Sequence, residues 1–229
     1  MRQTVAVLVT LGAFACSAPE AGQKPAAQPA PAAQPAPAKQ EAAKSTGSLP
    51  DGWKVRFDAP AAPDAVRLNT ADDSLTFTTG PAGIYYKTDM KAEKDYTLSA
   101  TFSQLKPTPT PQPYGLFIAG ADLDKETARY TAFLVRSDGK YQIVAWNAAA
   151  PRVVVDWTAA PPMREPKGVK TSNSISIRAL QGAVHFLVGE KEVHQMPRAK
   201  AGADGIAGVR IGSDLNVQVD KLSVKKFPE

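Results

Sequence analysis

Short runs of β-branched and aromatic residues, each bounded by Gly, Pro, Asp or Asn, recur from Trp53 to Phe227. Such runs are typical of β-strands, and no stretch keeps apolar residues at helical spacing over three turns. Without helices to cover a parallel sheet, the chain is expected to be all-β and to form an antiparallel sandwich of two sheets. The clearest strand candidates are Ser74–Thr79, Tyr96–Gln104, Gly115–Gly120, Tyr130–Arg136, Tyr141–Asn147, Val153–Trp157, Ser174–Leu180, Ala183–Val188, Lys191–Gln195, Gly205–Ile211 and Val217–Lys226.

The first residues have the pattern of a secretory signal peptide. Arg2 precedes an apolar run from Val5 to Phe14, and the small residue Ala15 follows it. The run is too short to span a bilayer, because a transmembrane helix needs ~20 apolar residues. We therefore expect residues 1–15 to be removed on export.

Cys16, the only cysteine of the chain, lies directly after the expected cleavage site. The residues before it resemble a bacterial lipoprotein box, with Ala13 in place of the usual leucine. An unpaired cysteine is unusual in an exported protein, so we expect Cys16 to carry a lipid anchor. Ser17 resembles the pattern of lipoproteins sent to the outer membrane, which predicts a place in the cell envelope, in the periplasm or at the cell surface. Simple secretion with an incidental cysteine is the alternative.

Residues 16–48 consist almost wholly of Ala, Pro, Gln, Lys, Glu and Ser, and Pro-Ala-Ala-Gln-Pro-Ala occurs twice in tandem, at 25–30 and 31–36. Such a segment is expected to stay unfolded and to act as a tether for a folded domain over 49–229. Of the 27 basic and 22 acidic residues, four basic and two acidic ones precede Leu49, which leaves the domain a net charge of +3. Its charges are scattered, so no nucleic-acid partner is expected.

A hairpin turn is predicted at Ser137–Lys140, where Asp138-Gly139 favours a two-residue type I′ loop. Such a loop would pair Arg136 with Tyr141. One face of this hairpin is then expected to form core with Phe133, Val135, Val144 and Trp146. The other face is amphipathic and carries the candidate ligand-binding residues Tyr130, Arg136, Tyr141 and Asn147. Aromatic platforms with a few polar groups on a rigid sheet suit carbohydrate binding; the alternative is that these aromatic residues only edge the core.

The chain's two histidines lie on either side of Gly189-Glu190, a pair suited to a type II′ turn. A two-residue loop would place His185 opposite His194, with Cβ atoms ~5 Å apart. Glu192 would share their face, so a His-His-Glu zinc site is conceivable, and the histidines are candidate catalytic groups near neutral pH. The simpler interpretation is a polar pair on an ordinary hairpin.

Several segments in this order resemble the concanavalin A-like lectin/glucanase superfamily, and most closely its laminin-G-like and 3-keto-disaccharide-hydrolase-like domains. The segments that carry the resemblance are Tyr96–Phe102, Tyr114–Ala119, Tyr130–Tyr141, Asn173–Arg178, Phe186–Gly189, Gly205–Arg210 and Val217–Val224. The resemblance implies a jelly-roll sandwich over 49–229. It implies sugar chemistry only loosely, because a fold does not fix a function.

Catalytic members of that superfamily carry acids on one strand as E-x-D-x-x-E, and this chain has no such run. Asp156, beside Trp157, is the best single carboxylate candidate, but a glycosidase needs two carboxylates ~5–9 Å apart. No cofactor is expected. The sequence thus favours an anchored, non-catalytic domain that binds a glycan or another cell-envelope component. A hydrolase or lyase acting on an oxidised disaccharide-like sugar is the first alternative, and a structural envelope protein is the second.

Overall fold

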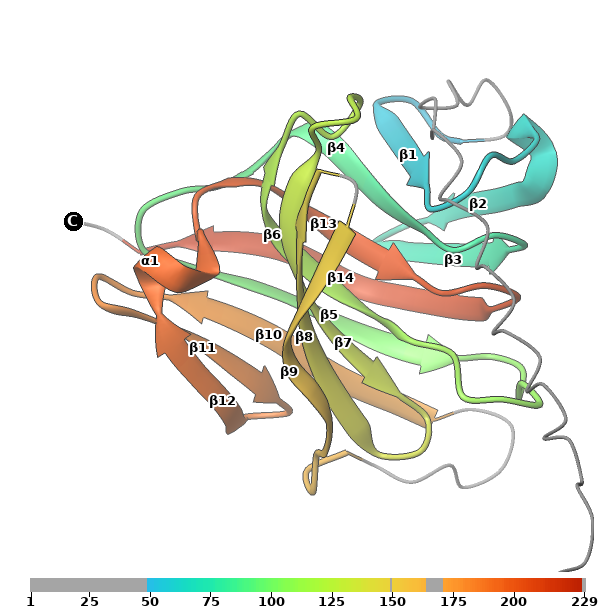
Figure 1. Ribbon diagram of the computed structural model, residues 1–229. Coiled ribbons are helices and arrows are strands. Elements are labelled where there is room, and N and C mark those ends of the chain that lie inside the picture. Colours follow the sequence, from blue (N-terminus) through green and yellow to red (C-terminus); the bar gives the residue numbers. More distant parts are fainter. Residues whose placement is uncertain (1–48, 149, 164–170, 228–229) are drawn as a thin grey trace, which may run out of the picture. The chain divides into compact units, whose positions relative to one another are not determined.

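The computed structural model describes residues 49–148, 150–163 and 171–227. The predicted signal peptide, Cys16 and the tether at 16–48 lie outside these residues. The described chain forms two antiparallel sheets of seven strands each, so the predicted all-β sandwich is confirmed (Figure 1). Among the described residues, no helix has the length and apolar character needed to cross a membrane.

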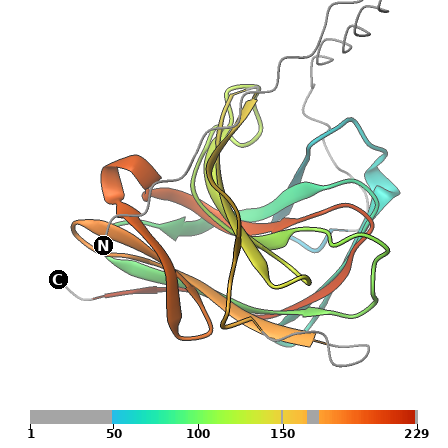
Figure 2. The same ribbon diagram turned by 60° about the horizontal axis from the view of Figure 1, so that its bottom comes forward.

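Sheet A has the strand order β1-β4-β13-β6-β7-β8-β9. Its strands are β1 (Trp53–Phe57), β4 (Gly83–Ala92), β13 (Gly205–Ile211), β6 (Tyr114–Ala121), β7 (Arg129–Arg136), β8 (Lys140–Asn147) and β9 (Ala150–Ala159). In Figure 2 the yellow strands β8 and β9 stand at a steep angle to orange β10 of the opposite sheet.

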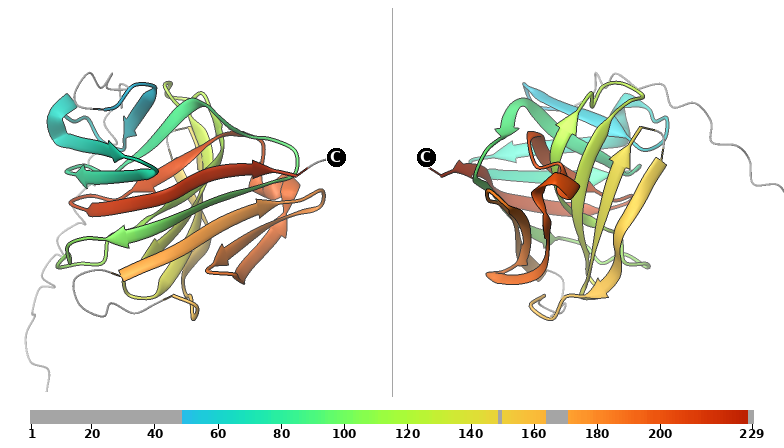
Figure 3. Two further views of the ribbon diagram at one scale, coloured as in Figure 1. Left: turned by 180° about the vertical axis from the view of Figure 1, so that it is seen from behind. Right: turned by 60° about the vertical axis from the view of Figure 1, so that its left-hand side comes forward.

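Sheet B has the strand order β12-β11-β10-β5-β14-β3-β2. Its strands are β12 (Lys191–Pro197), β11 (Ala183–Val188), β10 (Thr171–Ala179), β5 (Tyr96–Gln104), β14 (Asn216–Lys226), β3 (Ser74–Thr79) and β2 (Val66–Ala71). The left panel of Figure 3 shows this order from cyan β2 and β3 through red β14 to orange β10. Two short helices, η1 (Pro63–Ala65) and α1 (Arg198–Ala201), connect strands.

The main core lies between the sheets, because alternate side chains of each strand point inward. Its largest fully buried residues include Phe77, Phe102, Tyr114, Phe133 and Phe186. A second buried cluster lies on the other face of sheet A and contains Ile84, Tyr86, Phe117, Leu123, Tyr130, Ala132, Leu134 and Val144. Sheet A is therefore apolar on both faces.

The segment between β6 and β7 covers part of this outer face of sheet A. Leu123 of this segment belongs to the second cluster, and the Arg56 guanidinium of β1 donates hydrogen bonds to the Leu123 carbonyl (3.4 Å) and the Lys125 carbonyl (2.8 Å). Sheet A therefore has a partly covered outer face on which a recess can form.

The predicted register of the β7–β8 hairpin is wrong by one residue. Arg136 pairs with Lys140 and Val135 with Tyr141, so the loop has three residues, Ser137–Gly139. A type I′ turn needs positive φ at both central residues, and here only Gly139 has it, at +76°. The shift places Tyr141 in the main core and Trp146 on the outer face, the reverse of the prediction.

The β11–β12 hairpin starts in the predicted register and then departs from it. Val188 pairs with Lys191 and Leu187 with Glu192, as expected. A bulge at Val193 then shifts the strand, so Phe186 pairs with His194 and His185 with Gln195. The predicted pairing of the two histidines is therefore wrong, because one extra residue turns every later side chain to the opposite face.

Candidate functional site

Arg210 of β13 lies on the outer face of sheet A and is only 7% exposed. Its Nη1 donates to Asp58 Oδ1 at 2.9 Å and to the Tyr130 hydroxyl at 3.1 Å, while its Nη2 donates to Asp58 Oδ2. The centre of the guanidinium lies 4.3 Å from the Trp146 ring centroid. Burial alone would lower the pKa of Arg210, but Tyr130 and Asp58 outweigh it, so the side chain stays charged.

Tyr130 and Trp146 form the aromatic part of this network. They are register partners on β7 and β8, and their rings stack 4.8 Å apart at 9°. Phe117 packs on Tyr130 from the other side at 5.4 Å. Burial raises the pKa of Tyr130 well above its ordinary value, against a smaller opposing effect of Arg210, so the hydroxyl stays neutral.

A pocket of about 350 Å³ opens at this network, and we call it the arginine pocket. Its lining combines the half-exposed indole of Trp146 with charged groups from β1 and β13. The lining residues are Arg56, Phe57, Asp58, Ala128, Tyr130, Trp146, Ala148, Pro151 and Arg210. The volume lies at the lower end of the range of ~300–1,000 Å³ that is usual for small-molecule sites. An aromatic ring beside hydrogen-bonding groups that are fixed in place suits a ligand ring that has one apolar face and polar groups at its edge.

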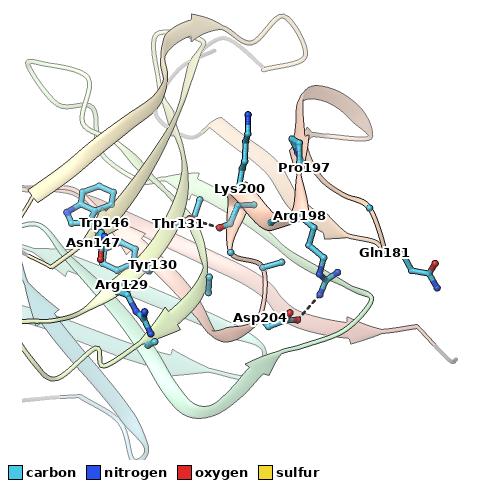
Figure 4. Close-up of a pocket in the computed structure, with 17 residues that line it drawn as sticks. Arg129, Tyr130, Thr131, Trp146, Asn147, Gln181, Pro197, Arg198, Lys200 and Asp204 are labelled. Carbon is cyan, nitrogen blue, oxygen red and sulfur yellow. Dashed lines mark hydrogen bonds and ion pairs between the residues drawn. The ribbon is translucent and has the colours of Figure 1, made fainter.

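A larger cleft of about 970 Å³ adjoins the arginine pocket, and Tyr130 and Trp146 line both. One wall of this end cleft is formed by the ends of β6, β7 and β8. The opposite wall is formed by the β10–β11 turn and by residues 197–204, which include α1 (Figure 4). The right panel of Figure 3 looks into this end of the sandwich, with β11 and β12 on one side and β6 to β9 on the other.

Two of the four predicted ligand-binding residues, Tyr130 and Asn147, line the end cleft. The structure does not bring the other two to it. Arg136 lies at the far end of β7, 4.1 Å over the Trp157 ring and hydrogen-bonded to Asp138 at 2.6 and 3.1 Å. Tyr141 is buried between the sheets.

The proposed His-His-Glu cluster divides between two faces of the β11–β12 hairpin. His185 Nδ1 lies 2.7 Å from Glu192 Oε2. His194 packs on the inward-facing Phe186 ring at 6.1 Å, and burial lowers its pKa. Among the described residues, no group of three His, Cys, Asp or Glu side chains is arranged to hold a metal.

Asp156, the candidate catalytic carboxylate, lies on β9. Its Oδ1 accepts hydrogen bonds from the Trp157 backbone N–H (2.7 Å) and from Gln142 Nε2 (3.3 Å). Neither partner is a carboxylate, so these contacts provide no acid pair of the kind that glycoside hydrolysis uses.

Sequence reasoning missed Asp58, Trp146 and Arg210 as site residues. A signal for Arg210 is present in the run Gly205–Gly212, where one arginine interrupts a strand of small and apolar residues. A charge at such a position is almost never buried without a partner. Its partner Asp58 is 152 positions away in the sequence, so only the fold identifies it.

Comparison with solved structures finds the same architecture in other proteins. The carbohydrate-binding module CBM66 from Bacillus subtilis matches with a TM-score of 0.57 at 10% identity, covering 76% of this chain and 96% of the module. A galectin-like protein of unknown function from the same organism matches with a TM-score of 0.55 at 12% identity, covering 76% and 89%. The domain has the concanavalin A-like jelly-roll fold.

A family 16 glycoside hydrolase, an endo-glucanase from Bacteroides ovatus, shares this jelly roll with a TM-score of 0.55 at 10% identity, covering 79% of this chain and 98% of the enzyme. The resemblance expected from the strand order is thus confirmed at the level of fold. No protein-family model matches the chain, and no curated protein matches its sequence.

Proposed function

We propose that the jelly-roll domain binds a glycan, with a sugar ring seated in the arginine pocket. The observation that carries this proposal is the convergence of Trp146, Asp58 and Arg210 at one pocket of the outer face. A sugar ring has an apolar face, which stacks on an indole, and hydroxyls, which exchange hydrogen bonds with a carboxylate and a guanidinium. Similarity to a carbohydrate-binding module and an endo-glucanase supports the proposal at the level of architecture.

The arginine pocket is held in shape before any ligand arrives. The Arg210 guanidinium is fixed by Asp58, Tyr130 and Trp146 together, so its orientation does not depend on a ligand. Pre-organised polar groups lower the entropic cost of binding. Asp58 is 40% exposed at its side chain and can therefore meet a ligand while holding the arginine.

The proposal is tested by titrating the full chain with a panel of soluble polysaccharides and their oligosaccharides. Trp146→Ala is expected to weaken the binding found with the wild type by about tenfold, which corresponds to ~1.4 kcal/mol. Trp157→Ala is the matched control, because its ring contacts Arg136 and lines neither pocket. Thermal melts of both variants establish that each remains folded.

Three outcomes contradict the proposal. The first is that the wild type binds no member of the panel, and the second is that both tryptophan variants lose affinity equally. The third is release of reducing sugar by the wild type at a rate abolished by Asp156→Asn, which would identify a hydrolase in place of a non-catalytic binding domain.

We further propose that the domain is exported and held in the bacterial cell envelope by a lipid on Cys16. The apolar N-terminal run, the single cysteine after it and the Pro- and Ala-rich segment that follows support this proposal. Wild-type protein is expected in the membrane fraction of a bacterial host and in the detergent phase on phase separation. Cys16→Ala should move it to the aqueous phase. A Cys16→Ala protein that stays with the membrane would overturn the lipid anchor.

A further inference from the structure

We infer that Arg56 is a positioning residue of the arginine pocket, because its guanidinium holds the segment 122–128 and this segment holds the hairpin that carries Trp146. The inference rests on the proposed glycan binding at the same pocket. Arg56 lines the pocket from β1. Its Nη1 donates to the Lys125 carbonyl at 2.8 Å and to the Leu123 carbonyl at 3.4 Å, so it joins β1 to the connection between β6 and β7.

The segment 122–128 carries the hydrogen bonding from Arg56 onward to the β8–β9 hairpin. The Lys125 carbonyl that accepts from Arg56 also accepts from the Ala128 N–H at 3.2 Å. The Ala128 carbonyl in turn accepts from the Ala148 N–H at 3.0 Å. Ala128 and Ala148 both line the arginine pocket. A continuous series of hydrogen bonds therefore runs beside the pocket, and Arg56 is its first donor.

Ala148 directly follows β8 in the hairpin that carries Trp146. Its φ is +57°, a left-handed conformation that is strained for a residue with a Cβ and that persists only when neighbouring groups hold it. The Ala128 carbonyl is one such group. Trp146 and Pro151 are register partners on this hairpin, and both line the pocket. The position of the segment 122–128 therefore affects the aromatic part of the pocket.

The charge of Arg56 has no acid partner in the pocket. Asp58 is the acid of the pocket lining, and Arg210 binds both of its oxygens. Arg56 forms no ion pair with any residue that the structure describes. Its guanidinium is thus left to the carbonyls of the segment, and a hydrogen bond from a charged donor is stronger than one between neutral groups.

Leu123 gives the segment a second anchor, which lies outside the pocket lining. Its side chain is 2% exposed and belongs to the second cluster of sheet A. Shortening this side chain should loosen the segment without removing any group of the pocket lining. A Leu123 variant therefore separates positioning by the segment from direct contact between Arg56 and a ligand.

The first part of the test measures the segment without a ligand. Hydrogen exchange of the full chain reports the Ala128 and Ala148 N–H groups, which are protected while the series of hydrogen bonds holds. Arg56→Met is expected to speed exchange at both groups by about tenfold, and Arg56→Lys, which keeps a charged donor, by less. Lys125→Met is the matched control and should leave both rates unchanged, because Arg56 contacts the carbonyl of residue 125 and not its side chain.

The second part of the test measures binding of the oligosaccharide that the wild type binds most tightly. Arg56→Met and Leu123→Ala should each weaken this binding by about fivefold, because the pocket is less pre-organised. Leu134→Ala is the matched control for Leu123→Ala, since it shortens an equally buried leucine of the same cluster that lies on β7 outside the pocket lining. It should keep the wild-type affinity, and thermal melts establish that each variant is folded at the temperature of the titration.

Three results overturn the inference alone. The first is unchanged exchange at Ala128 and Ala148 in Arg56→Met. The second is full affinity in Leu123→Ala together with weakened binding in Arg56→Met, which would assign Arg56 to direct contact with the ligand. The third is faster exchange in Arg56→Met with no loss of affinity. Absence of glycan binding by the wild type is a different failure, because it overturns the proposed function and this inference together.

Discussion

The hydroxyl of Tyr141 donates a hydrogen bond to the carbonyl of Val193 across a distance of 2.9 Å, and so joins strand β8 of sheet A to strand β12 of sheet B. Val193 is the bulge residue of its hairpin, which leaves its carbonyl outside the regular pairing of β11 and β12. The bulge that separates the two histidines thus also supplies an acceptor to the opposite sheet.

Tyr141→Phe is expected to lower the free energy of unfolding by ~1 kcal/mol, the usual net value of one hydrogen bond. Urea denaturation measures this change. The matched control is Tyr85→Phe, because the Tyr85 hydroxyl is buried and has no hydrogen-bond partner among the described residues. Removing an unsatisfied hydroxyl should be neutral or stabilising, so equal losses in the two variants would contradict the assignment.

Arg210→Met is expected to destabilise the domain by about 3 kcal/mol, because breaking a buried ion pair leaves its partner's charge uncompensated. The loss should lie at the low end of the known range, since Asp58 remains partly exposed. Lys125→Met is the comparison, because it removes the exposed ion pair between Lys125, whose side chain is 65% exposed, and Asp122. This variant should leave the denaturation midpoint unchanged. If Arg210→Met leaves the denaturation midpoint unchanged, the network of Arg210, Asp58 and Tyr130 contributes nothing to the stability of the domain.

Gly208→Ala is expected to cost ~1–3 kcal/mol through overpacking. A Cβ at Gly208 would meet the Tyr85 carbonyl oxygen and would lie 2.7 Å from Phe117 Cε1 in the second cluster. Gly182→Ala controls for the loss of glycine itself, because no atom lies within 4 Å of its added Cβ. Thermal melts should show a lowered midpoint for the first variant and no change for the second.

The stability of the domain is expected to fall as the pH drops below about 7, in part because of His194. Burial lowers the pKa of His194 from its ordinary value of 6.5, against a smaller opposing effect of Glu192. The unfolded state therefore binds a proton at higher pH than the folded state does. The stability that neutral His194 contributes is complete above pH 6.5 and is lost as the pH falls towards the folded-state pKa. His194→Gln should flatten this part of the stability–pH curve. A curve identical to that of the wild type would exclude His194 as the cause.

Strand positions were predictable because the pattern of apolar and turn residues is local. Candidates such as Tyr96–Gln104 and Gly205–Ile211 coincide with β5 and β13. Which side of a strand faces the core depends on the number of residues in the loop before it. The Asp138-Gly139 pair is compatible with both a two-residue and a three-residue loop. Because Asp138 lacks positive φ, the loop has three residues. This loop length places Tyr141 in the main core and Trp146 on the outer face.

The candidate site was less predictable than the fold, because it is assembled from distant segments. Tyr130 and Asn147 were recognised as surface groups of one hairpin, whereas Arg210 comes from a strand that sheet order places two positions away from β7. Asp58 comes from the other end of the domain sequence. The turn residues Gly189-Glu190 determine only the first pairs of the hairpin. The bulge at Val193 comes after those pairs, so the turn residues do not predict it.

Arg198, which lines the end cleft, connects three segments of the chain through its side chain. Its one side chain reaches the β4–β5 turn at Lys94, the end of β10 at Leu180 and the segment after α1 at Asp204. Arg129, Asn147 and Lys200 make no contribution to that clasp, so each can change without releasing the wall. Substitutions at these three positions are therefore expected to change the lining of the end cleft and to leave the arrangement of its walls unchanged.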